Sequence, residues 1–71
     1  MGRLTERIRR STSRYRAGVA RELREARYES GMTQAVLARR SGVGRRTIAR
    51  MECARCIPAP STLTRIDSVL D

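Results

Sequence analysis

The chain has no histidine, lysine, tryptophan or phenylalanine, and it has only two tyrosines, two cysteines and two prolines in 71 residues. Because histidine and lysine supply the commonest general base, the commonest metal ligand and the usual Schiff-base amine, we expect no enzyme. No apolar run reaches the 18 residues of a membrane-spanning helix, and no apolar segment suits a secretory signal. Cys53 and Cys56 form a lone CxxC without further zinc ligands, so we expect no metal and no cofactor, only reduced thiols. An intermolecular zinc site or disulfide is the alternative.

The chain is strongly basic, with 16 arginines against seven acidic residues and a formal net charge of +9. Arginine presents a planar fork of donors that pairs two-fold with a phosphate group or with a guanine edge. A small body with this charge favours a polyanionic partner, and nucleic acid is the main candidate. An anionic membrane surface competes, but the basic N-terminal stretch lacks the Trp and Phe that anchor interfacial helices, so we expect no membrane.

The apolar residues recur at helical spacing, which predicts a small all-α bundle of four to five helices. We expect a short basic helix over residues 4–10 and a longer one over 15–30, with a single continuous helix as the alternative. A third helix follows the N-cap Thr33 and stops at Gly42, and a fourth covers about 45–53. Two prolines within three residues predict a loop over residues 54–60, and a last helix begins near Ser61 or Thr62.

Five pieces of the sequence occur in order between Leu23 and Leu70: LREAR, GMTQ, LARRSGV, RRTIARME and the frame that starts at Pro58. Together they resemble the phage repressor and Cro family of helix-turn-helix DNA-binding domains, the XRE-like family with the lambda-repressor fold. The likeness runs over this stretch without an insertion or deletion. The resemblance implies a DNA-binding domain over 15–71 with its helix-turn-helix at about 33–53. It leaves residues 1–14 as a basic N-terminal arm or a short extra helix.

The resemblance also implies roles for individual residues. The helix over about 45–53 lies in the major groove, where its base-reading positions hold Arg45, Arg46, Ala49 and Arg50. Contact with phosphates alone is the alternative role for these arginines. Phosphate-binding roles fall to residues at the two helix N-termini and to two flanking arginines, namely Thr33, Gln34, Gly44, Arg39 and Arg55. Arg27 and Glu52 match a structural ion pair that joins the first main helix to the base-reading helix.

Three departures from the family pattern are visible. Ala54 stands where the family usually has glycine, which predicts a strained or different turn. Gly44 replaces the usual Ser or Thr cap. The family usually continues into a further helix beyond Asp71, so we expect residues 4–15 to replace that helix by covering the core or pairing subunits, or else to lie along DNA.

These observations predict a cytoplasmic transcriptional repressor of Cro type from a phage or bacterium. It would bind double-stranded operator DNA as a homodimer, with one copy on each half-site. The alternative is an antitoxin-type DNA-binding regulator whose N-terminal segment also docks a protein partner.

Overall fold

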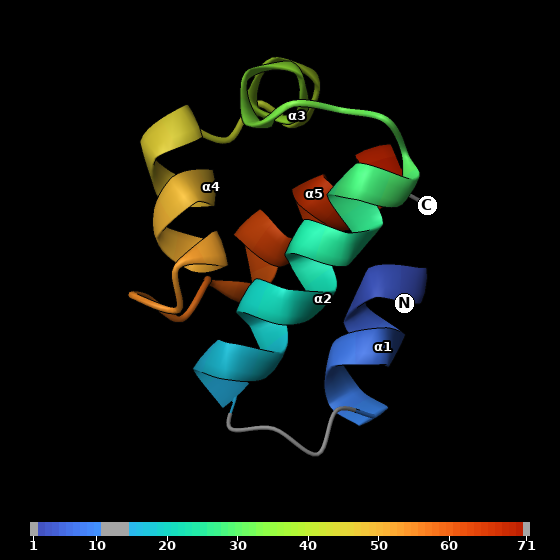
Figure 1. Cartoon of the computed structure of the whole chain (residues 1–71), viewed down its shortest axis with the longest axis vertical. Helices are drawn as coiled ribbons and strands as arrows, with labels where there is room; N and C mark the ends of the chain where they lie inside the picture. The colour runs from blue at the N-terminus through green and yellow to red at the C-terminus, as the bar shows by residue number, and fades with distance from the viewer. Residues whose placement is uncertain (1, 11–14, 71) are drawn as a thin grey trace.

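The computed structural model describes residues 2–10 and 15–70, and within them it contains helices and no strand. The helices are α1 (Arg3–Arg10), α2 (Tyr15–Glu29), α3 (Gln34–Ser41), α4 (Arg45–Glu52) and α5 (Pro60–Leu70). In Figure 1, α2 lies between α1 and α4, α3 crosses one end, and α5 lies behind. Helix α2 packs on α1 and α4, and α5 packs on α1 and α3. The predicted all-α class is therefore confirmed.

The core is aliphatic, as the scarcity of aromatic residues requires. Each helix contributes to the core, α3 through Leu37 alone, and the buried residues of α2 follow an i, i+4, i+7 pattern. The fully or nearly buried residues are Leu4, Ile8, Val19, Leu23, Ala26, Leu37, Val43, Ile48, Met51, Leu63 and Ile66. The core thereby holds the short helices α3 and α4 in place, since helices of eight residues are not stable alone.

Helix α1 is fixed to the bundle at both its apolar face and its N-terminus. Leu4 and Ile8 are buried, and burial of two such side chains contributes about 3–6 kcal/mol. The backbone N–H groups of Leu4 and Thr5 donate to the Asp67 carboxylate at 3.0 and 3.1 Å, and the Thr5 hydroxyl donates to it as well. A Cβ atom at Gly2 would clash with this carboxylate, so a larger residue there would force the Asp67 side chain to shift. Helix α1 therefore covers part of the core, and the other roles expected for residues 4–15 stay predictions.

Arg7 adds an electrostatic connection between α1 and α2. Its guanidinium contacts Glu22 at 2.9 Å, Glu25 at 3.4 Å and Glu29 at 2.9 Å. The pKa of Arg7 is raised above its usual value, chiefly by the hydrogen bond to Glu29. Residues 11–14 lie outside the described residues, so the domain boundary expected after residue 14 stays a prediction.

The start of α5 differs from the sequence-based expectation. The predicted loop included Pro60, but Pro60 is the first residue of the helix. Proline is well suited to that position because its missing N–H would have no helical partner there and its φ is already helical. The carbonyl of Ala59 accepts the first helical bond, from the N–H of Leu63 at 3.0 Å. At the other end of the loop, α4 stops at Glu52 and Cys53 is its C-cap.

Candidate nucleic-acid interface

Helices α3 and α4 form a helix-turn-helix unit whose ends are set by local capping. The Thr33 side chain accepts a hydrogen bond from the N–H of Val36 at 3.1 Å, which caps the start of α3. Gly42 ends α3 in the left-handed conformation, with φ of 73°, and donates its N–H to Ala38 at 3.0 Å. Val43, only 7% exposed, anchors the turn in the core. The short turn through Gly42, Val43 and Gly44 therefore fixes the angle between the two helices.

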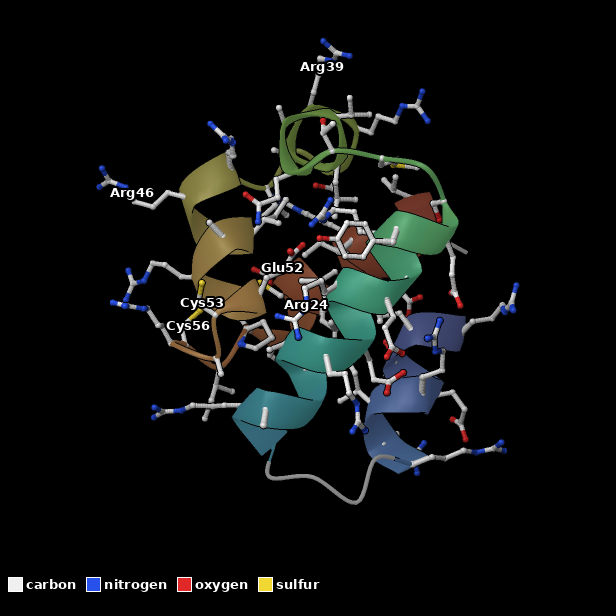
Figure 2. The ribbon with its side chains drawn as sticks, viewed as in Figure 1. Arg24, Arg39, Arg46, Glu52, Cys53 and Cys56 are labelled. Atoms are coloured by element: carbon white, nitrogen blue, oxygen red, sulfur yellow. The ribbon has the colours of Figure 1, made fainter. Side chains whose placement is uncertain are left out.

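The side of α4 opposite the core carries arginine. Ile48, Met51 and Glu52 are buried, which fixes the inward side of the helix. Because successive residues turn by about 100°, Arg46 and Arg50 lie on the outward side. Both are exposed, and Figure 2 shows Arg46 extending from α4 away from α2.

Arg45 and Ala49 lie at the edge of this outward side. Arg45 is exposed and Ala49 is half-buried. The four base-reading positions predicted from the resemblance therefore form one continuous strip on α4.

The expected phosphate-binding residues fall into separate groups. Thr33 and Gln34 line one hollow of about 430 Å³ with Arg45, beside the N-terminus of α3. Gln34 also donates its amide Nε2 to Glu52 Oε1 at 3.2 Å, which connects α3 to α4. Arg55 lies instead with Arg46 and Arg50 at a second hollow.

The two remaining residues of that set line neither hollow. Arg39 is exposed on α3 and points outward in Figure 2. Gly44 is the N-cap of α4 and provides no side-chain cap.

Arg27 and Glu52 form a buried, two-fold ion pair between α2 and α4. The Arg27 guanidinium donates from Nε to Glu52 Oε2 at 2.7 Å and from Nη2 to Oε1 at 2.8 Å. It also donates to the carbonyl of Met32 at 2.9 Å and lies 4.6 Å from the ring centre of Tyr28. The hydrogen bonds to Glu52 raise the pKa of Arg27 above its usual value. The pair orients α4 on α2.

A second arginine of α2, which no motif of the sequence indicates, caps the end of α4. Arg24 donates to the backbone carbonyl of Glu52 at 3.1 Å, and Figure 2 shows the two residues together. A cation at a helix C-terminus satisfies an open carbonyl and opposes the negative end of the helix dipole. No local signal identified Arg24, because its partner is a backbone atom 28 residues away.

The turn after α4 contains a strained residue. Ala54 has φ of 58°, and among the described residues it is the one non-glycine residue with positive φ. This conformation costs an L-residue about 1–2 kcal/mol. The neighbouring Cys53 is exposed and Cys56 half-buried, and both are free thiols. In the described part of the chain, no three His, Cys, Asp or Glu residues form a group that could hold a metal ion.

Charge is unevenly distributed over the surface. All the acidic side chains that the structure describes are engaged by groups of α1 and α2, and these are Glu6, Glu22, Glu25, Glu29, Glu52 and Asp67. By contrast, the arginines of α3, α4 and the loop after it make no ion pair with a described residue, and these are Arg39, Arg40, Arg45, Arg46, Arg50 and Arg55. The helix-turn-helix face therefore carries positive charge that no described carboxylate neutralises, the kind of surface that attracts polyanions.

Comparison with known proteins agrees with this architecture. Residues 19–71 match the family model described as "Helix-turn-helix domain", which covers most of α2 and all of α3, α4 and α5, while α1 precedes the match. Comparisons with the curated proteins and with the solved structures found no match. No helix in the described part is long and apolar enough to cross a membrane. The family predicted from the sequence is confirmed, and the chain belongs to the helix-turn-helix family of DNA-binding domains.

Proposed function

We propose that the protein is a transcriptional repressor of Cro type that binds operator sites in double-stranded DNA. One observation carries the proposal. The outward side of α4 presents three exposed arginines without ion-pair partners among the described residues, although the chain has acidic side chains that pair elsewhere. A surface that served only folding would not keep like charges together without neutralising them, whereas a DNA groove supplies the opposite charge.

In this proposal α4 enters the major groove and its exposed strip contacts base edges. Arg46 and Arg50 are suited to the two-fold bond with O6 and N7 of guanine, the commonest specific contact of arginine. Arg45 would contact the base edges nearest the N-terminus of α4. Ala49 presents a methyl group that can contact the methyl of thymine. Each half-site should therefore contain at least one guanine.

Phosphate contacts on both sides of α4 would hold it in register. The N-terminus of α3, with Thr33 and Gln34, favours a phosphate because its N–H groups and the helix dipole point toward it. The bond from Gln34 to Glu52 keeps this N-terminus in a fixed position relative to α4. Further phosphate contacts would come from the Gly44 amide, Arg39 and Arg55.

The size of the chain is compatible with two copies on one operator. The longest extent of the Cα trace is 29 Å, and half-sites one helical turn apart are separated by roughly 34 Å. The two lengths are of the same order, which is compatible with one copy on each half-site on the same side of the duplex. We propose a homodimer on DNA, which represses by occupying the promoter in the cytoplasm of a bacterium or of a phage-infected host.

The antitoxin alternative has no observation that favours it over the repressor. It requires the N-terminal segment to dock a partner protein. The apolar side chains of α1 that would suit such docking, Leu4 and Ile8, are buried within the chain.

The proposal is tested by in vitro selection from random duplex DNA at near-physiological salt, followed by sequencing. We expect an inverted repeat with guanine in each half-site. Recovery of a single half-site would show specific DNA binding but would contradict the homodimer. If no motif is enriched, the arginines of α4 contact only the sugar–phosphate backbone of the DNA, and the repressor proposal fails.

A base-level test follows from the same selection. Arg46→Ala should weaken operator binding by about 1–3 kcal/mol and relax the preference at one base pair. The matched control is Arg65→Ala, because Arg65 is exposed on α5, outside the helix-turn-helix. Affinities for operators with single base changes measure both effects. An equal loss on every sequence would show that Arg46 contacts phosphate alone.

A further inference from the structure

A cluster of arginines from three separate segments surrounds one open hollow of about 770 Å³. It is lined by Arg16 of α2, by Arg46 and Arg50 of α4, and by Ala54 and Arg55 of the following loop. We call this the arginine hollow. Arg16 had no role in the sequence analysis, because it stands 30 residues before Arg46 and precedes the residues that resemble the repressor family.

No acidic residue is among the described residues that line the arginine hollow. Its four arginines are exposed, and none forms an ion pair or side-chain hydrogen bond with a described residue. The first turn of α2 has no acidic residue. The nearest carboxylate along that helix, Glu22, is already engaged by Arg7 and Arg21. Like charges gathered in this way repel one another, so the hollow does not serve folding and is complete only with an anion.

The lining also decides the kind of anion. Pockets for small molecules are mostly apolar with a few polar groups, whereas this hollow is lined by four arginines and one alanine. Guanidinium forks suit phosphate oxygens. An open hollow with several such forks suits a DNA strand better than one small ligand. The bases of the strand would contact Arg46 and Arg50, and its phosphates would contact Arg16 and Arg55.

We infer that Arg16 binds the sugar–phosphate backbone of the DNA, so that the protein–DNA contact extends from the helix-turn-helix onto the first turn of α2. This inference rests on the proposed function. The major groove is about 12 Å wide and is filled by one helix of about 10–12 Å. Because α4 occupies it, a side chain from α2 reaches only the groove wall, which is backbone. The positive end of the α2 dipole lies at the same place and favours the same phosphate.

The inference is tested with Arg16→Gln, compared with Arg65→Gln as the control of equal charge change outside the hollow. Each variant is titrated with the selected operator and with a shuffled duplex, between about 50 and 200 mM salt. Loss of one phosphate contact should make the negative slope of log K against log salt less steep by about 0.9. Arg16→Gln should show this change with both duplexes and should leave the selected motif unaltered. Arg65→Gln should leave the slope unchanged.

A second measurement identifies the contact on the DNA itself. Single phosphates of the operator are replaced in turn by uncharged methylphosphonate. With the wild-type protein, one substitution outside the base pairs read by α4 should weaken binding, and with Arg16→Gln the same substitution should have no effect. This difference between positions is insensitive to any change in the amount of folded protein.

The outcomes separate the inference from the proposed function. Specific binding by the wild type, with equal slopes and identical methylphosphonate profiles for wild type and Arg16→Gln, would overturn the inference and leave the repressor proposal standing. A changed base preference in Arg16→Gln would also overturn it, because Arg16 would then contact a base. Absence of duplex binding by the wild type would overturn both.

Discussion

The buried ion pair between Arg27 and Glu52 gives the sharpest prediction about stability. Glu52 is 4% exposed and accepts two bonds from Arg27 and one from Gln34. Glu52→Gln keeps the shape of the side chain but leaves the Arg27 charge buried without a counter-charge. Breaking one partner of a buried pair costs about 3–5 kcal/mol. The free energy of unfolding should fall by that amount.

This loss is large relative to the stability of so small a domain. At about 0.05–0.15 kcal/mol per residue, a chain of 71 residues has a free energy of unfolding of about 4–11 kcal/mol. A loss of 3 kcal/mol should lower Tm by at least about 12 °C. Urea and thermal unfolding followed by circular dichroism measure both quantities.

Two controls show whether the buried charge is the cause. Glu25→Gln removes a carboxylate that is 53% exposed and 3.4 Å from Arg7, and it should cost less than about 1 kcal/mol. Replacing both buried partners, as Arg27→Met with Glu52→Leu, should recover most of the loss because no charge is then left unpaired. If Glu52→Gln costs no more than Glu25→Gln, the reasoning is refuted.

Two further predictions concern backbone strain and the attachment of α1. Ala54→Gly should raise the free energy of unfolding by about 1 kcal/mol by relieving the positive φ, whereas Ala17→Gly, at an exposed helical position, should lower it. If urea titrations show an unchanged or lower free energy of unfolding for Ala54→Gly, the claim that Ala54 is strained is contradicted. Asp67→Ala should cost about 2 kcal/mol and speed tryptic cleavage within α1, because the first N–H groups of α1 lose their acceptor. Its control is Ser68→Ala at the exposed neighbouring position, and equal cleavage of the two variants would show that Asp67 does not hold α1.

Local signals in the sequence located most of the helices. Gly42 marked the end of α3 because a left-handed residue there favours glycine, and Thr33 marked its start because its hydroxyl accepts a backbone N–H. The same kind of reasoning failed at Pro60. A proline pair was interpreted as loop, although proline fits the first turn of a helix as well as it fits a turn.

Contacts between distant residues could not be found in this way. Asp67 caps α1 across more than 60 residues, and nothing near either residue signals the contact. Arg16 and Arg46 line the same hollow only because α2 packs on α4. The ion pair of Arg27 and Glu52 was expected through resemblance to a family and not from any physical pattern in the chain. The base and phosphate roles assigned to individual residues stay predictions.

The central claim is that α4 recognises a particular DNA sequence. The most direct measurement is the ratio of dissociation constants for the selected operator and for a shuffled duplex of the same length and composition, at near-physiological salt. The account predicts a ratio of about 10³ or more in favour of the operator, and a smaller ratio for Arg46→Ala. Equal affinity for the two duplexes would contradict it, since the arginines of α4 would then recognise only the charge of the backbone.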